Sequence, residues 1–258
     1  IRDSVASRGL GDVYKRQIKT FIRKYIDAVM FDTKGERLAE EGIWHHVFRE
    51  SFRSGGWKNE VGLSMGRWAG GASFFYVLHR ILEDIRPTKI VELGLGESTK
   101  LISAYGSNED WLEQHVVIEH SENWITSFAS RFETCQATRI QLCGLDGKTD
   151  NAPSQPGLKY AGLSDELWSQ AELVVVDGPF GSLHNSRSNA LDFISQLESD
   201  SPFILLLDDS HRQGEKETLK SISTILKARK IKHHLKEYRG AKSCSIVCSG
   251  HYPWLASL

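Results

Sequence analysis

The pattern of apolar and polar positions changes along the chain, from one that favours helices to one that alternates strands with helices. Apolar side chains fall on one helical face over residues 18–31, and they recur at spacings of three and four over residues 68–85 until Pro87. We therefore expect an amphipathic helix over 18–31, an irregular helical segment over 35–62 and a long helix over 68–85. The first helix either packs on the domain or lies on a membrane surface.

From residue 89 onward, short apolar strands alternate with amphipathic helices. This alternation predicts a parallel sheet with helices on both faces. Residues 233–238 and 243–248 flank the turn Arg239–Lys242 and predict an antiparallel hairpin at the sheet edge. The other expected strands are 89–94, 115–119, 139–145, 173–177 and 203–208, and the expected helices are 98–105, 122–134, 164–170, 187–197 and 215–229.

Composition narrows the class of protein. Lysine and arginine number 32 against 33 aspartate and glutamate residues, so no basic field points to a nucleic-acid partner. The apolar residues are dispersed, and no run approaches the length of an integral membrane segment. The four cysteines lack paired-ligand spacing, which favours reduced thiols in the cytoplasm. The sequence does not indicate an oligomeric state.

The N-terminal residues are set apart from the rest. Asp12 to Gln17 resembles the translation of a transposon end used as a sequencing adapter, so residues 1–17 are interpreted as a disordered artefact and excluded from fold reasoning. A genuine polar N-terminus is the alternative. Under the first interpretation the natural start, with any targeting signal, is missing. Residues 18–63 are then an N-terminal helical extension, and residues 64–258 form one domain.

The most informative stretch runs from Val91 to Thr99, where a buried strand leads through a turn into a helix. The turn contains Gly94 and Gly96, which allow a close approach of backbone to ligand and positive φ angles. The helix start at Ser98 offers unpaired amide groups. Glu92, two residues before the first glycine, suits a cationic or hydroxyl-bearing ligand better than a bare pyrophosphate.

Acidic residues also end the other predicted strands, where open α/β sheets bind their ligands. Glu119 ends the second strand and follows Gly96 by 23 residues, the place where an acid accepts hydrogen bonds from a ribose. This geometry also fits a nicotinamide dinucleotide, although Thr99 replaces the third glycine of G-x-G-x-x-G. The remaining acids at strand ends are Asp146, Asp177, Asp208 and Asp209.

With these features the chain resembles the class I S-adenosylmethionine-dependent methyltransferases over about residues 64–250. That family has an acid-x-Gly-x-Gly turn and a Rossmann-like, seven-stranded, mostly parallel sheet that ends in an antiparallel hairpin. The resemblance implies that S-adenosylmethionine binds at the turn, with Glu92 acting indirectly and Ser98 at the helix start. It assigns Gly94 and Gly96 to the methionine part, Glu119 to the ribose and Asp146 to the adenine.

Three of the acids carry a second resemblance. Asp177, Asp208 and Asp209 are similar to the magnesium ligands of metal-dependent O-methyltransferases, and hard oxygen ligands suit Mg²⁺. A metal acting as Lewis acid would ease the loss of a hydroxyl proton. The alternative roles are structural: Asp208 caps the following helix, Asp209 pairs with Arg212, and Asp177 anchors the turn at 178–181.

Other residues could carry catalysis or substrate binding. His211, as a neutral imidazole, or Asp177 could take the hydroxyl proton without a metal. His184 and Arg187 lie where the family places substrate contacts, and Arg187 could grip a carboxylate or phosphate unless it is a surface arginine.

The resulting expectation is an S-adenosylmethionine-dependent O-methyltransferase. Its acceptor is a hydroxyl of a sugar, a glycan precursor or another small metabolite, as in polysaccharide biosynthesis. The alternatives are a nicotinamide-dependent oxidoreductase or epimerase and a non-catalytic interaction protein on the same fold.

Overall fold

The structure is a computed structural model that describes residue 19 and residues 33–53, 56–148 and 152–258. Residues 1–17 and, apart from residue 19, the predicted helix over 18–31 lie outside these ranges. Within them, no helix is both long enough and apolar enough to cross a membrane.

A single seven-stranded sheet forms the centre of the fold, in the order β3-β2-β1-β6-β7-β9-β8. Its parallel pairs join β1 to β2 and β6, β2 to β3, and β6 to β7, whereas β9 is antiparallel to both β7 and β8. This confirms the predicted Rossmann-like, mostly parallel sheet with its C-terminal antiparallel hairpin. The strands are β1 Lys89–Leu93, β2 Gln114–Glu119, β3 Thr138–Leu142, β6 Leu173–Val176, β7 Ile204–Leu207, β8 His233–Tyr238 and β9 Cys244–Ser249.

The middle strands are apolar because both of their faces are covered. β6 and β7 contain only leucine, valine and isoleucine, and every one of these residues is buried. The strand order reverses between β1 and β6, since β1 is followed along the chain by β2 on one side while β6 lies on the other. Ligands of open α/β sheets bind outside the carboxyl ends of the strands at such a reversal.

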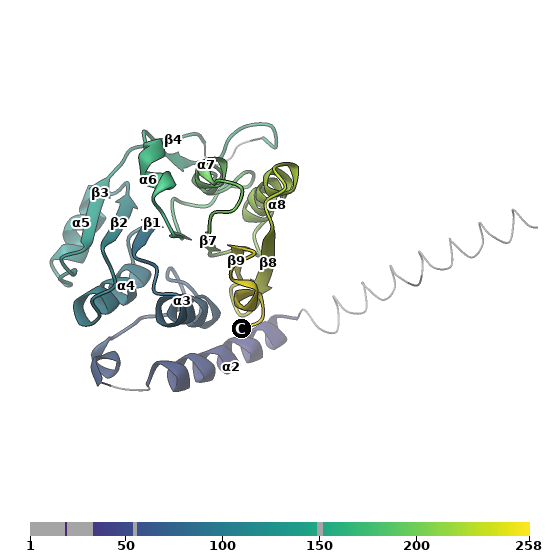
Figure 1. Ribbon diagram of the computed structural model, residues 1–258. Coiled ribbons are helices and arrows are strands. Elements are labelled where there is room, and N and C mark those ends of the chain that lie inside the picture. Colours follow the sequence, from purple (N-terminus) through teal and green to yellow (C-terminus); the bar gives the residue numbers. More distant parts are fainter. Residues whose placement is uncertain (1–18, 20–32, 54–55, 149–151) are drawn as a thin grey trace, which may run out of the picture.

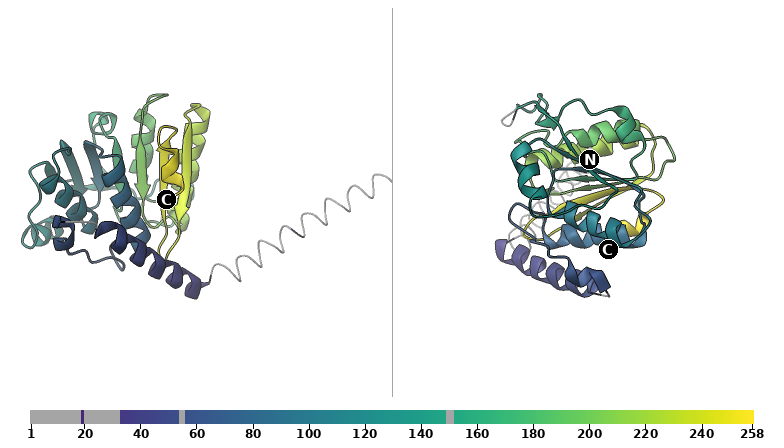
Figure 2. Two further views of the ribbon diagram at one scale, coloured as in Figure 1. Left: turned by 60° about the horizontal axis from the view of Figure 1, so that its bottom comes forward. Right: turned by 90° about the vertical axis from the view of Figure 1, so that its left-hand side faces the viewer.

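Helices cover the two faces of the sheet as separate layers (Figures 1 and 2). One apolar core joins the sheet to α2, α3 and α4, and a small cluster next to it joins α5 to β2 and β3. A second large core joins the other face to α6, α7 and α8. The helices are α2 Lys34–Phe52, α3 Ala72–Asp84, α4 Glu97–Asn108, α5 Glu122–Ala129, α6 Asp165–Ser169, α7 Asn189–Gln196 and α8 Gln213–Ala228, with 3₁₀ helices η1 Gly56–Glu60 and η2 Pro253–Ala256.

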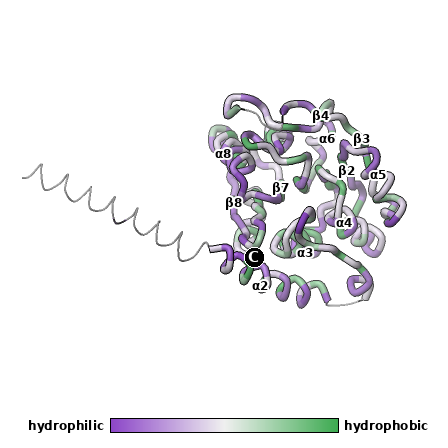
Figure 3. The backbone as a smooth tube through the Cα atoms, turned by 180° about the vertical axis from the view of Figure 1, so that it is seen from behind, coloured by the Kyte–Doolittle hydropathy of each residue, from purple (hydrophilic) through white to green (hydrophobic). Residues whose placement is uncertain are grey.

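The N-terminal extension is more regular than the sequence indicates. Instead of an irregular segment, α2 is a helix of 19 residues whose N-cap Thr33 accepts a hydrogen bond from the Glu36 amide. Hydrophilic and hydrophobic residues alternate around it in Figure 3, and its buried residues are Phe48 and Phe52. It packs against α3, which supplies the tertiary contacts that local sequence does not show.

The third strand ends earlier than predicted. β3 stops at Leu142, and a separate two-stranded antiparallel ladder follows, formed by β4 Leu145–Asp146 and β5 Lys159–Tyr160. Asp146 therefore ends β4 of this ladder and not a strand of the seven-stranded sheet. The predicted α3 also begins late, at Ala72, because two glycines precede it.

A buried histidine makes stability depend on pH. His79 in α3 is 2% exposed and contacts the Tyr105 hydroxyl over 2.7 Å, while that hydroxyl donates to Glu83. Burial lowers the pKa of His79 to about 4, with the Lys58 ammonium adding to the decrease and Glu83 opposing it. In the unfolded chain the histidine takes up a proton at a higher pH than it does in the fold. Acid therefore stabilises the unfolded chain relative to the fold and lowers the free energy of unfolding.

We expect the contribution of His79 to stability to be complete above pH 6.5 and to fall as the pH drops toward about 4. At pH 5 the free energy of unfolding should be about 2 kcal/mol lower than at pH 7. This pH lies about 1.5 units below the ordinary pKa of histidine, and each unit corresponds to about 1.4 kcal/mol. Urea denaturation of wild type and His79→Gln at pH 7 and pH 5 measures this loss. Equal losses in the two proteins would contradict this role for His79.

Candidate functional site

The turn after β1 lies against the segment that follows β6. Gly94 has φ 102°, a conformation that favours glycine, and a Cβ atom added there would lie 2.9 Å from the Gly178 nitrogen. The Gly94 amide donates to the Ile118 carbonyl over 2.9 Å, which ties the turn to β2 as well. Gly96 then precedes α4, and a Cβ at Gly96 would meet no atom within 4 Å. The turn is thus packed against backbone at Gly94, whereas space is free beside Gly96.

Glu92 lies beneath this turn and is fully buried. Its carboxylate accepts a hydrogen bond from the Ser98 hydroxyl at the start of α4 and contacts the His115 Nε2 atom over 3.0 Å. The Ser98 side chain is buried too, at 3% exposure. From these positions Glu92 and Ser98 can affect a ligand only through the turn.

Glu119 links the turn to the end of β2. One carboxylate oxygen accepts from the Leu95 amide at 3.2 Å, and the other accepts from the amides of His120 and Ser121 at 2.7 and 2.8 Å. Trp124 in α5, which the sequence reasoning missed, donates from Nε1 to the Leu95 carbonyl over 2.7 Å. Both backbone polar groups of Leu95 are therefore held, and the turn is fixed.

Two further side chains differ in their relation to the turn. Asp146 is exposed in β4, and no described contact joins it to the turn. Tyr160, which the sequence reasoning missed, is 1% exposed, and its hydroxyl has no hydrogen-bond partner among the described residues. That hydroxyl lies beside Gly178, where an added Cβ would be 2.6 Å away. Since buried hydroxyls are normally bonded, Tyr160 marks this place as suited to a polar ligand.

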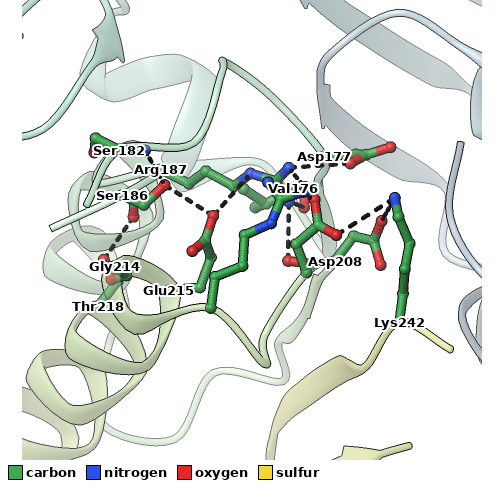
Figure 4. A network of polar contacts seen from close by, with 12 residues as sticks. Val176, Asp177, Ser182, Ser186, Arg187, Asp208, Gly214, Glu215, Thr218 and Lys242 are labelled. Carbon is green, nitrogen blue, oxygen red and sulfur yellow. Dashed lines mark hydrogen bonds and ion pairs between the residues drawn. The ribbon is translucent and has the colours of Figure 1, made fainter. Parts of the chain in front are cut away.

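The predicted acids after β6 and β7 do meet. Asp177, Asp208 and Asp209 each have a carboxylate oxygen within 4.8 Å of the others, a spacing compatible with a shared metal ion. Figure 4 shows Asp177 and Asp208 of this carboxylate cluster, with Arg187 and Lys242 beside them. Asp208 is fully buried, and neither of its oxygens has a hydrogen-bond partner among the described residues.

Arg187 lies inside the carboxylate cluster, so the expectation of a surface arginine is wrong. It is 3% exposed and donates to the Asp209 carboxylate at 3.0 Å, to the Asp177 carboxylate at 3.3 Å and to the Asp208 carbonyl at 2.9 Å. Its Nε atom lies 3.7 Å from the buried Glu215 carboxylate. A guanidinium so enclosed is not available to grip a substrate carboxylate or phosphate.

The pKa values of the three carboxylates are shifted in different directions. Burial and the neighbouring Asp208 raise the pKa of Asp177 well above its ordinary value, against the opposing effect of Arg187. Burial also raises the pKa of Asp208, with Asp209 adding to the increase. For Asp209, burial is outweighed by Arg187, Lys242 and other cations, so its pKa is lowered. Asp209 therefore stays ionised more readily than its two neighbours.

Lys242 is a member of this site that the sequence reasoning missed. Its ammonium nitrogen lies 3.5 Å from an Asp208 oxygen and 3.4 Å from an Asp209 oxygen, and it donates to the Ala69 carbonyl over 3.0 Å. It comes from the turn between β8 and β9. Because β8 is antiparallel to β9, which is antiparallel to β7, this turn lies at the carboxyl end of β7, a position that the predicted hairpin already implied.

The remaining predicted residues lie around the cluster. His211 Nδ1 accepts from the Ser243 amide at 3.3 Å, and burial lowers the pKa of its imidazole, which is therefore neutral at pH 7. His184 is turned toward α8, where its Nδ1 lies 3.0 Å from a Glu217 oxygen.

Of the structural alternatives considered for the acids, the pairing of Asp209 with Arg212 is confirmed at 3.0 Å. Helix capping by Asp208 is wrong, because α8 has Arg212 at its N-cap and no side-chain cap.

Two cavities of about 450 and 460 Å³ are present elsewhere in the described molecule. The first lies toward the amino ends of β1 and β2, beside α6, and the second lies between α2 and β8. Neither is lined by a predicted site residue.

No protein-family model matches the chain, and no curated protein matches it. Among solved structures it is similar to the O-methyltransferase TomG from Streptomyces achromogenes in complex with SAM, at 13% identity and a TM-score of 0.42 over 67% of this chain and 78% of that one. An O-methyltransferase from Bacillus cereus in complex with SAH is similar at 10% identity and a TM-score of 0.45 over 88% and 96% of the two chains.

A third similar structure is the hMettl16 catalytic domain in complex with MAT2A 3'UTR hairpin 6, at 12% identity and a TM-score of 0.42 over 82% and 81%. All three likenesses are low in both measures, and the fold assignment rests on the strand order of the sheet.

Proposed function

We propose that this protein is an S-adenosylmethionine-dependent O-methyltransferase. The observation that carries the proposal is the direct contact between the glycine turn after β1 and the Asp177–Gly178 segment after β6, where a Cβ on Gly94 would lie 2.9 Å from the Gly178 nitrogen. A methyl donor bound on the turn would therefore have its reactive end beside the carboxylate cluster. Donor site and acid-base groups lie at the reversal of strand order, as open α/β sheets favour.

On the donor side, each predicted residue keeps a role compatible with its place. Gly94 and Gly96 form the backbone surface for the methionine part, supported from below by Glu92 and Ser98. Glu119 faces the ribose hydroxyls, and its carboxylate, with about four lone-pair sites, retains acceptor capacity beyond the three amides it binds. Asp146 would approach the adenine from the β4–β5 ladder.

On the acceptor side, Asp177 takes the proton. It is the most accessible acid of the carboxylate cluster, with a side chain that is 17% exposed against 1% for Asp208 and 3% for Asp209. As the acceptor oxygen bonds to the methyl carbon and the sulfur–carbon bond breaks, the hydroxyl proton passes to the Asp177 carboxylate. Alignment of oxygen, methyl and sulfur can supply roughly 7–11 kcal/mol of the barrier. Neutral His211 is the other candidate base.

The carboxylate cluster also fits a magnesium ion. Both Asp208 oxygens and one Asp209 oxygen are buried without hydrogen-bond partners among the described residues, and oxygen ligands of this kind suit Mg²⁺. Asp177, Asp208 and Asp209 would hold the ion. When bound, it would supply Lewis acidity toward the acceptor oxygen.

For the acceptor we propose a hydroxyl of a sugar, a glycan precursor or another small metabolite. His184, at the edge of the segment after β6, remains a candidate substrate contact. We assign Arg187 to the support of the carboxylate cluster instead, because its guanidinium is enclosed.

Calorimetry tests the donor site. We expect wild type to bind S-adenosylhomocysteine and not NAD, and Glu119→Ala to bind it at least about tenfold more weakly, because a lost charge-assisted hydrogen bond costs about 1.5–3 kcal/mol. Glu122→Ala, an exposed acid three residues further along, is the matched control. Binding of NAD would favour an oxidoreductase, and binding of neither nucleotide would refute the proposal.

A further inference from the structure

Lys242 occupies the side of the carboxylate cluster that Arg187 leaves open. Arg187 engages Asp177 and one oxygen of Asp209, whereas the Lys242 ammonium lies 3.4 Å from the other Asp209 oxygen and 3.5 Å from Asp208. Those two oxygens are among the buried carboxylate oxygens that lack a hydrogen-bond partner in the described part of the chain. Each is thus held by an ion-pair contact to Lys242 without a hydrogen bond, and such a contact can be exchanged.

The charges around the carboxylate cluster favour binding of a metal ion only when one of the resident cations has moved away. Asp177, Asp208, Asp209 and Glu215 are four carboxylates that face the three cations Arg187, Arg212 and Lys242. With all groups ionised, one negative charge remains, and removal of the Lys242 ammonium would leave two. Arg187 is enclosed by five polar partners, which are three carboxylates and two carbonyls, and cannot leave without unfolding its surroundings. Lys242, in contrast, is on a turn and has a side chain that is 17% exposed.

We propose that Lys242 is an internal cation that competes with a divalent metal ion for Asp208 and Asp209. In the metal-free protein its ammonium neutralises these carboxylates, and the metal ion binds after that ammonium has moved away. Lys242 is then a positioning residue that sets metal affinity. The proposal rests on the proposed function only in taking the carboxylate cluster as the metal site.

Contacts from α2 hold the turn that carries Lys242 and so influence how strongly its ammonium competes with a metal ion. Glu41 in α2 accepts hydrogen bonds from the Ala72 amide at 2.7 Å and from the Ala241 amide at 3.0 Å, so it binds the residue directly before Lys242. Trp44, also in α2, donates to the Arg239 carbonyl over 2.6 Å. The hairpin turn is thus held against α2 and α3, and this anchorage directs Lys242 toward the carboxylate cluster.

Calorimetric titration of the full chain with Mn²⁺ alone tests the competition. We expect Lys242→Met, which keeps the length of the side chain and removes its charge, to bind Mn²⁺ at least about tenfold more tightly than wild type, a change that corresponds to 1.4 kcal/mol. Lys242→Arg should restore weak binding. Lys236→Met, an exposed lysine of the same hairpin, is the matched control and should behave as wild type. Asp208→Asn should abolish the binding, which places the ion in the carboxylate cluster.

Glu41→Ala extends the test to the anchorage. It should raise Mn²⁺ affinity by less than Lys242→Met does, and the double variant should equal Lys242→Met, since both changes act through one ammonium group. Thermal unfolding of each variant checks that the fold is retained. Additive effects in the double variant would overturn the role of Glu41.

Unchanged or weaker Mn²⁺ binding by folded Lys242→Met would overturn the proposal, as would the absence of binding in both proteins. The same samples are titrated with S-adenosylhomocysteine, without metal. That titration decides the donor site independently, so failure of the competition and failure of the proposed methyltransferase activity give different results.

Discussion

Replacing Asp177 with asparagine is expected to lower methyl transfer about 10²–10⁴-fold, the contribution typical of a positioned acid or base. The amide keeps the size of the carboxylate but cannot accept the hydroxyl proton. Donor affinity should be retained, because the atoms of this segment that lie nearest to Gly94 belong to the backbone. Single-turnover rates and calorimetry with S-adenosylhomocysteine measure the two effects separately.

Two further variants show whether a loss of turnover is specific to Asp177. Asp165→Asn changes an exposed acid at the start of α6 and should leave turnover unaltered. His211→Asn removes the other candidate base. If His211→Asn loses turnover while Asp177→Asn retains it, the proton goes to the imidazole and the assignment of Asp177 is wrong.

Replacing Arg187 with methionine should destabilise the fold by about 3–5 kcal/mol, the usual cost of breaking a buried ion pair by removing one partner. The loss would leave Asp177, Asp209 and Glu215 without their shared cation. The substitution also removes the donors to the Asp208 and Val176 carbonyls, at 2.9 and 3.4 Å, which join the ends of β6 and β7. Urea denaturation at pH 7 measures the change.

Arg212→Met is the comparison for this prediction. Its side chain is 45% exposed and pairs with the same Asp209 oxygen, so its removal should cost no more than about 1 kcal/mol, the range of surface ion pairs. Similar losses for the two variants would mean that the enclosed position of Arg187 gives it no special role in stability.

The parts of this molecule that could be predicted from the sequence are those set by local pattern. The apolar runs of β6 and β7 identify interior strands, and the glycine turn after β1 follows from Gly94 and Gly96. The spacing of Asp177, Asp208 and Asp209 anticipates their meeting, because carboxyl ends of neighbouring parallel strands share one edge.

The parts that escaped prediction depend on tertiary contacts. α2 is regular because it packs on α3, and the β4–β5 ladder pairs segments that lack strand periodicity. Arg187 looks like a loop arginine in sequence, and only the fold shows that five polar partners enclose it. Lys242 was within reach, since the predicted hairpin already placed its turn at the same edge as the acids.

The absence of side chains between Gly94 and Gly178 has a consequence for the order of events in turnover. A small shift of the turn after β1 should displace the segment after β6, because their backbones are in direct contact at Gly94 and Gly178. If the glycine turn holds the nucleotide as proposed, we expect its occupancy to shift the Asp177–Gly178 segment before any acceptor arrives. Under the proposed function, this backbone contact predicts that the ligands load in a fixed sequence, nucleotide first.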